Sequence, residues 1–378
     1  MDLTDTPEEA AFRAEAREWL ESHVPRPALP SGDTRDGFAR HLDWERDLFA
    51  ARWSAVSWPE RFGGRDASLF QWLVFEEEYY RSGAPQRVTQ NGIFLLAPAL
   101  FAFGTPEQQE RYLPRMAAAE ELWCQGWSEP GAGSDLASLT SRAERDEPAG
   151  GWRLSGQKTW TTRGAFCTHL FGLFRSDPAS SRHHGLSYFL VPLESEGVTV
   201  RGFGRLDGDE GFADVFFDAV FVPDDAMLGA PGEGWRIAMA TTGSERGLTL
   251  RSPGRYTAAA ERLVELARGR AEPGGAAGHR VAEAWMRAEA YRLFTLAQVT
   301  RMLEEGLREA ETSLNKLYWS ELDVAIHEAA IDLLGSESEL EGPWSRGYMF
   351  ALGGPIYAGT NEIQRNLVAE RLLGLPRR

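Results

Sequence analysis

The hydrophobic pattern of this 378-residue chain changes period twice, and that change constrains the fold more than any other feature of the sequence. Up to about residue 122, apolar residues recur at helical spacing. In "TPEEAAFRAEAREWLE" (6–21), Thr6 and Glu9 form a capping box that predicts the start of a helix. Further helices are predicted in "SLFQWLVFEEEYYRSGAP" (68–85) and in "GTPEQQERYLPRM" (104–116).

From about Trp123 onward, short runs rich in aromatic and β-branched residues alternate with Gly, Pro, Ser and Asp clusters. The runs are "GWRLSGQKTW" (151–160), "THLFGLF" (168–174), "LSYFLVPL" (186–193), "VTVRGF" (198–203) and "ADVFFDAVFVP" (213–223). No helical pattern separates them, which argues against a parallel dinucleotide-binding sheet. After "GAPGEGW" (229–235) the helical period returns and continues to the end, apart from "RGRAEPGGAAGHR" (268–280). We therefore predict a helical domain over 1–122, a β domain over 123–232 and a helical domain over 233–378.

Charge and composition exclude several classes of function. Forty basic residues against 56 acidic ones give a net charge of −16, which disfavours nucleic acid or an anionic membrane as a partner. No apolar run approaches the roughly 20 residues of a membrane span, and the N-terminus is acidic where a signal peptide is basic, so we expect a cytoplasmic protein. Two cysteines and seven histidines show no metal-ligand spacing, so no metal is predicted. Lys158 and Lys316 are the only lysines, which we interpret as a compositional preference for arginine.

The segment "CQGWSEPGAGSD" (124–135) lies where the helical pattern gives way to strands. Pro130 and Gly131 favour a tight turn, and Gly131 and Gly133 allow the backbone to approach a ligand closely. A dinucleotide fingerprint would need a further glycine at position 136, where this chain has Leu136. Taken alone, the segment is equally consistent with a glycine-rich surface turn.

The segment "SGQKTWTTRG" (155–164) places Trp160 and Thr162 two residues apart on one predicted strand. Alternate residues of a strand share a face, so an aromatic plane and a hydroxyl donor lie side by side. That pair suits a flat ring with polar edges. The alternative is a hairpin with an ordinary core tryptophan.

Together with "FDAVFVPDDAMLGAPGEGW" (217–235) and "YAGTNEIQRN" (357–366), these segments resemble the acyl-CoA dehydrogenase family in order and spacing. The resemblance extends from "SWPERFGG" (57–64) to Leu375. It implies an α+β multidomain fold with an N-terminal helical domain, a central β-barrel and a C-terminal four-helix bundle. It also implies FAD-dependent oxidation of an acyl-CoA to the 2,3-enoyl thioester, in which one base removes the α proton while a hydride passes from the β carbon to flavin N5.

The resemblance also assigns site residues. Contacts to FAD are implied for Gln125, Trp127, Ser128, Gly133, Ser134, Trp160, Thr161, Thr162, Arg270, Thr360, Asn361 and Glu362. Contacts to the substrate are implied for Ser134, Arg246, Ala358 and Gly359.

The catalytic base is the residue on which this sequence departs from the commoner family pattern. In most members the glutamate that acts as the catalytic base stands at the position of Ala358. The methyl group of alanine cannot accept a proton. Other members use a glutamate followed by arginine on the first helix after the barrel, which corresponds here to Glu245 and Arg246. On a helix that begins near Gly234, Glu245 falls on a weakly polar stripe, where desolvation would raise its pKa toward that of a general base. The alternative is that Glu245 belongs to an exposed charged patch. The small Ala358 predicts a pocket for branched or bulky acyl groups.

The C-terminal third departs from the family in the residues that reach the FAD of a neighbouring subunit. Arg270 keeps an arginine there, but no Phe-Gly pair follows it, and Asp332 lies near the place of a glutamine. An acid beside a pyrophosphate is unfavourable. These departures disfavour FAD binding across a dimer of this chain, and an assembly of two unlike subunits, as in some bacterial members, is one resolution. The resemblance implies a homo- or hetero-oligomer, with an electron-transfer flavoprotein as a further partner. Two other functions stay open: a non-catalytic or half-active subunit of a heteromeric dehydrogenase, and a flavin oxidase or monooxygenase on the same fold.

Overall fold

The chain packs into two compact units that interleave along the sequence. The computed structural model describes residues 3–247, 252–272, 274–305 and 309–376, without the side chains of 242–247, 252, 305, 309 and 310. The helical unit comprises residues 1–28, 67–84 and 246–378, and the sheet unit comprises residues 29–66 and 85–245. Since the N-terminal helices are shared between both units, the predicted domain boundaries at residues 122 and 232 stay a prediction.

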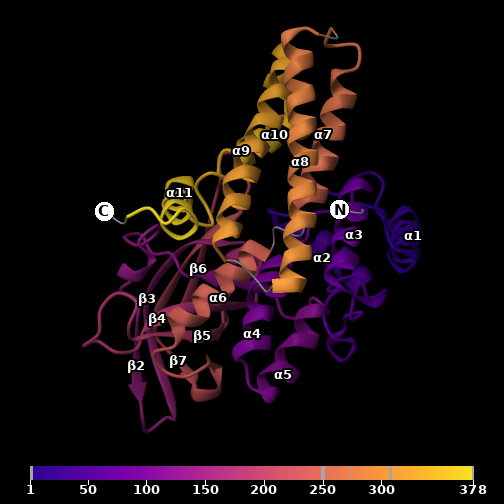
Figure 1. Ribbon diagram of the computed structural model, residues 1–378. Coiled ribbons are helices and arrows are strands. Elements are labelled where there is room, and N and C mark those ends of the chain that lie inside the picture. Colours follow the sequence, from indigo (N-terminus) through magenta and orange to yellow (C-terminus); the bar gives the residue numbers. More distant parts are fainter. Residues whose placement is uncertain (1–2, 248–251, 273, 306–308, 377–378) are drawn as a thin grey trace. The chain divides into compact units, whose positions relative to one another are not determined.

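The helical unit is built around three long helices at its C-terminal end. Its helices are α1 (Pro7–His23), α3 (Leu69–Arg81), α7 (Ser252–Ala267), α8 (Ala276–Glu305), α9 (Glu309–Leu334), α10 (Pro343–Ala351) and α11 (Asn361–Leu367). Helices α7, α8 and α9 lie side by side, and α3 packs on α7 (Figure 1). Their core contains Leu263, Tyr291, Leu322 and Ile326, which are almost completely buried. Burial of this apolar surface stabilises the unit.

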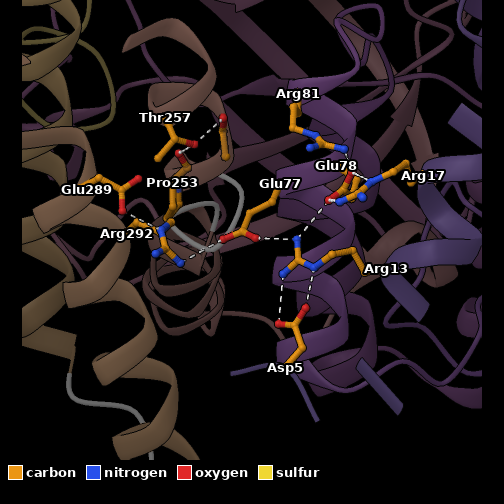
Figure 2. Close-up of polar contacts among 11 residues, drawn as sticks. Asp5, Arg13, Arg17, Glu77, Glu78, Arg81, Pro253, Thr257, Glu289 and Arg292 are labelled. Carbon is orange, nitrogen blue, oxygen red and sulfur yellow. Dashed lines mark hydrogen bonds and ion pairs between the residues drawn. The ribbon is translucent and has the colours of Figure 1, made fainter. Parts of the chain in front are cut away.

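Ion pairs fasten the N-terminal segments to the helical unit (Figure 2). Glu78, at the end of α3, is only 3% exposed and accepts hydrogen bonds from Arg13 and Arg17 of α1. Arg81 pairs with the same carboxylate at 3.0 Å, and Arg13 also reaches Glu77 at 2.9 Å. Although burial opposes it, hydrogen bonds from Arg17 and Arg13 hold the pKa of Glu78 below its ordinary value. The carboxylate is therefore a charged junction between α1 and α3.

The sheet unit contains a single eight-stranded mixed sheet with helices around it. Its helices are α2 (Arg35–Ala50), α4 (Ala97–Phe103), α5 (Pro106–Ala117) and α6 (Gly234–Gly247), the last two residues of α6 belonging to the helical unit. Its strands are β1 (Trp123–Gly126), β2 (Arg142–Asp146), β3 (Gly151–Thr162), β4 (His169–Arg175), β5 (Leu186–Pro192), β6 (Val198–Phe203), β7 (Phe212–Pro223) and β8 (Met227–Leu228). The strand order is β6-β7-β3-β2-β4-β5-β8, with β1 parallel to β4. Five ladders are antiparallel, as the lack of helices between the predicted strands indicated.

The fold class predicted from the sequence is confirmed, with helices before and after a central sheet. Thr6 accepts a hydrogen bond from the backbone of Glu9, whose side chain accepts one from the backbone of Thr6, so the predicted capping box is present. A second box, of Thr105 and Gln108, opens α5. Each of the five predicted strands is present, with its first residue within one position of the expected one. Helices α2 and α4 and strands β1, β2 and β8 were not predicted.

Candidate functional site

A tight turn carries the glycines of the first candidate segment. The backbone N–H groups of Glu129 and Ala132 each donate to the other's carbonyl at 3.0 Å, which closes the turn around Pro130 and Gly131. A Cβ atom added at Gly131 or Gly133 would meet nothing within 4 Å, so the backbone is open to close approach. A pocket of about 310 Å³ lies along this turn. It is lined by Glu129, Pro130, Gly131, Ala132, Ser138, Thr140 and Gln157.

Beneath the turn, Glu129 and Lys158 form a buried ion pair with an oxygen-to-nitrogen distance of 2.8 Å. The Glu129 carboxylate also accepts from the backbone and hydroxyl of Thr140, at 2.7 and 2.9 Å, and from the backbone of Ser141 at 2.9 Å. Burial opposes ionisation of Glu129, but the Lys158 ammonium and these donors lower its pKa to about 2. Burial lowers the pKa of Lys158 to about 8, so the pair is charged at neutral pH.

The low pKa of Glu129 predicts that the sheet unit loses stability in acid. Because the folded-state pKa, about 2, lies below the ordinary 4.5, this carboxylate stabilises the fold above about pH 4.5 and less as pH falls toward 2. The difference corresponds to about 3 kcal/mol. We expect Glu129→Gln to flatten the fall in unfolding free energy between about pH 5 and pH 3, measured by denaturant titration. Glu144→Gln, at an exposed residue of β2, should keep the wild-type slope. If the unfolding free energies of wild type and Glu129→Gln fall equally steeply with decreasing pH, the prediction is wrong.

Strand β3, which carries the second candidate segment, contains a bulge. Its pairing with β7 shifts register between Lys158 and Thr161, and Trp160 adopts a positive φ of 57°. Thr161 is buried and Thr162 is half-buried, whereas Trp160 is 60% exposed. The regular alternation from which a shared face of Trp160 and Thr162 was expected is therefore interrupted. Their contacts to a flat ring stay a prediction.

The exposed Trp160 ring is held in place by its neighbours. It meets Phe203 and Phe212 edge-on, with ring centroids 5.3 and 5.5 Å apart. The strand is fixed to the first segment because the backbone N–H of Thr159 donates to the carbonyl of Ser128 at 2.9 Å. The sheet unit therefore brings the two predicted segments, 125–134 and 160–162, together. Trp127, by contrast, is buried and packs edge-on against Tyr188.

Helix α6 carries the predicted base. Ser187 accepts a hydrogen bond from the backbone of Gly232 just before the helix. Trp235, in the first turn, contacts His183 with the two rings tilted by 43° and their centroids 4.3 Å apart. Ala238 and Thr241 are completely buried. Glu245 and Arg246 lie in the last turn of α6, and their side chains are outside the described part of the structure.

The C-terminal candidate segment is a strained turn that leads into α11. Ala358 and Gly359 have positive φ angles of 56° and 78°. Gln364 donates to the carbonyl of Ala358 at 3.1 Å, and a Cβ at Gly359 would lie 2.6 Å from the Gln364 amide nitrogen. This close contact and the positive φ favour glycine at position 359. The side chain of Thr360 caps α11 by accepting from the backbone of Ile363. Gly359 and Glu362 are exposed, and Asn361 is buried.

Two residues of α9 hold the side chain of Asn361 by hydrogen bonds. Its side-chain oxygen accepts hydrogen bonds from Lys316 at 2.8 Å and from Ser320 at 3.1 Å. The sequence reasoning missed both lysine contacts, those of Lys158 and Lys316. The rarity of lysine was the signal that could have identified them.

Arg270 and Asp332 are both engaged on the surface of the helical unit. Arg270 forms a bidentate pair with Glu337 at 3.0 Å, and Asp332 pairs with Arg280. Since an arginine faces Asp332, its charge is compensated within this chain. The predicted role of Arg270 toward FAD stays a prediction.

The described residues contain no group of three or more acidic, histidine or cysteine side chains placed to hold a metal ion. Within the same residues, no helix has the length and apolar character needed to cross a bilayer.

Comparison with known proteins gives consistent matches over almost the whole chain. Three family models match: acyl-CoA dehydrogenase, N-terminal domain (residues 6–120), middle domain (124–220) and C-terminal domain (232–373). Acyl-CoA dehydrogenase IpdE1 of Mycobacterium tuberculosis is 41% identical over 380 residues, covering 97% of each chain. The human mitochondrial short-chain specific acyl-CoA dehydrogenase is 32% identical over 338 residues, covering 84% of this chain and 79% of the relative.

Solved structures give the same picture. The structure named "Tcur3481-Tcur3483 steroid ACAD" superposes with a TM-score of 0.88 at 26% identity and full coverage of both chains. The ChsE4-ChsE5 complex from Mycobacterium tuberculosis superposes with a TM-score of 0.83, also at 26% identity and full coverage.

Proposed function

This chain belongs to the acyl-CoA dehydrogenase family and is an acyl-CoA dehydrogenase, and we propose that it oxidises a bulky, ring-bearing acyl-CoA with FAD as cofactor and Glu245 as base. Two features together carry this proposal: position 358 has an alanine, which cannot accept a proton, and the last turn of α6 has a glutamate, Glu245.

The sheet unit offers features that fit a flavin. The Trp160 ring is exposed but held by two phenylalanines, and the backbone around Gly131 and Gly133 is unobstructed. An exposed aromatic plane and a glycine backbone open to close approach, both on the sheet unit, suit a flat ring with polar edges and an anionic tail. We assign cofactor contacts to the backbone and side chains of 125–134, to Trp160, Thr161 and Thr162, and to Thr360, Asn361 and Glu362 of the helical unit. When bound, FAD supplies the hydride acceptor.

The period of α6 supports Glu245 as the base. Ala238 and Thr241 are buried and mark the inward face of α6. Position 245 is seven residues after Ala238 and four after Thr241, so it falls on the same face of the helix. A carboxylate on such a face is partly desolvated, which raises its pKa and suits it to remove the α proton of the thioester. Arg246 lies about 100° further around the helix, where we assign it to the CoA moiety.

Ala358 supports a large acyl group. A methyl group in place of a carboxylate side chain leaves space beside Gly359, the residue that we assign to substrate contact. The solved relative at 26% identity is named as a steroid enzyme, which agrees with a ring-bearing substrate.

We also propose that a second, related chain completes the enzyme. Two of the solved relatives carry names that join two chains, Tcur3481-Tcur3483 and ChsE4-ChsE5. On this chain Arg270 and Asp332 are engaged by Glu337 and Arg280, so the residues expected to reach a neighbouring subunit's FAD already have partners. Electrons would then leave to an electron-transfer flavoprotein.

The test is flavin reduction under anaerobic conditions. The purified chain should retain FAD, seen as its visible absorption, and cyclohexanecarbonyl-CoA should bleach that absorption faster than butyryl-CoA or isobutyryl-CoA. A preference for butyryl-CoA would refute the bulky pocket. Absence of flavin, both alone and after co-purification with a candidate second chain, would favour the non-catalytic subunit. Rapid reoxidation of the bleached enzyme by oxygen, with product formed only in air, would favour an oxidase or monooxygenase.

A further inference from the structure

The chain has only two lysines among its 40 basic residues, and both are buried. Lys158 is completely buried and Lys316 is 3% exposed. A general preference for arginine explains why lysine is rare, but it does not explain why the remaining lysines avoid the surface, where the side chain is most often found.

Lys158 joins the two candidate flavin segments of the sheet unit. It lies on β3 two residues before Trp160, and its ammonium donates to Glu129 at 2.8 Å and to the Trp127 carbonyl at 3.4 Å. The ammonium nitrogen also lies over the Phe174 ring, 4.8 Å from the ring centroid. The ammonium thus connects the strand that presents Trp160 with the turn closed by Glu129.

In the helical unit, Lys316 supports the C-terminal candidate flavin segment in a similar way. It lies on α9 and donates to the side-chain oxygen of Asn361 at 2.8 Å. Asn361 is the first residue of α11, and its backbone N–H donates to the Pro355 carbonyl at 2.9 Å. The lysine therefore supports the turn that contains Ala358 and the residues Thr360 to Glu362.

At the Lys158 site an ammonium fits where a guanidinium does not. Lysine presents a compact charge with three donors, whereas arginine presents five donors in a planar fork. At Lys158 the protein supplies two oxygen acceptors and an aromatic face, so a guanidinium would leave buried N–H groups without acceptors.

We propose that Lys158 and Lys316 are positioning residues that hold the two flavin-contact segments in their binding geometry. The lysines do not touch the flavin; they act through Glu129, Trp127 and Asn361. This inference rests on the proposed function, because that function assigns the flavin contacts to these segments.

The test compares charge-removing and charge-keeping variants of the whole chain. We expect Lys158→Met and Lys316→Met each to weaken FAD binding about tenfold or more, the loss typical of outer partners of a binding site, and to shift the visible spectrum of the remaining bound flavin. Lys158→Arg should not restore binding. Lys158→Met/Glu129→Gln should bind FAD more tightly than Lys158→Met, because it removes the unpaired buried carboxylate. FAD affinity is measured by titration of the apoprotein with free FAD.

Matched controls lie on the same elements. Arg153→Met on β3 and Glu328→Gln on α9 change exposed residues and should leave the affinity and the spectrum unchanged. Hydrogen exchange of the flavin-free protein gives an independent readout, since Lys158→Met should lower the protection of the Thr140 and Ser141 amides, which donate to Glu129. If Lys158→Met does not fold, Glu129→Gln takes its place in both measurements.

The outcomes separate this inference from the proposed function. If the wild type binds FAD and both Met variants bind it with unchanged affinity and spectrum, the inference is wrong and the proposed function stands. If the wild type binds no FAD, either alone or together with a second chain, the proposed function fails. In that case unchanged exchange protection in Lys158→Met would overturn the positioning role as well. Ready labelling of either lysine by an amine-reactive reagent in the native protein would also overturn it.

Discussion

Glu245→Gln is expected to slow reduction of the bound flavin by the true acyl-CoA by about 10²–10⁴-fold, the contribution typical of a general base. Glutamine keeps the size of the side chain but cannot accept the α proton. FAD content and acyl-CoA affinity should be unchanged, because the substitution removes a proton acceptor and no binding group. Stopped-flow measurement of flavin bleaching under anaerobic conditions separates the chemical step from binding.

A double variant tests whether the base can be moved. Ala358 is already a non-glycine residue with a positive φ of 56°, so a glutamate there carries the same kind of backbone cost as the alanine. Relative to Glu245→Gln, we expect Glu245→Gln/Ala358→Glu to recover part of the rate of flavin reduction by butyryl-CoA. The recovery should be smaller with a ring-bearing substrate. Glu110→Gln, at an exposed residue of α5, is the matched control. A wild-type rate in Glu245→Gln would place the base elsewhere and end the proposal.

Local interactions made much of the fold predictable. A capping box joins residues three apart, so Thr6 with Glu9 and Thr105 with Gln108 could be identified from residue type and spacing alone. Strands such as β6 and β7 were equally clear, because their aromatic and β-branched runs are bounded by Gly and Pro. Helix α2 was missed since its buried face includes polar residues, His41 and Glu45 among them.

The candidate site depends on contacts that local pattern cannot show. Glu129 and Lys158 are 29 residues apart, and Lys316 and Asn361 are 45 apart. The bulge before Thr161 inserts an extra residue into β3, which no alternation of residue types announces. Sequence reasoning therefore predicted the segments that we assign to the site but not the residues that hold those segments in place.

Asp33→Asn is expected to destabilise the sheet unit by about 3–5 kcal/mol, because it leaves the buried guanidinium of Arg163 without its anion and removes one of the anions that pair with the half-buried Arg205. Asp33 is 2% exposed and accepts from Arg163 at 2.6 Å and from Arg205 at 2.5 Å. Burial opposes its ionisation, but the two arginines hold the pKa of Asp33 below its ordinary value. The melting temperature should fall on the order of 10 °C.

The loss should also reach the flavin segment. Arg163 directly follows Thr162 at the end of β3, has a φ of 55° and donates its backbone N–H to the Gly211 carbonyl at 2.9 Å. Releasing its side chain therefore loosens the strand end that presents Trp160, and Asp33→Asn should retain less FAD through purification. Asp43→Asn is the matched control, since it breaks an exposed pair with Arg46, which is worth about 1 kcal/mol or less. Equal melting temperatures for the two variants would mean that Asp33 does not anchor the strand, because the two arginines would then have found other acceptors.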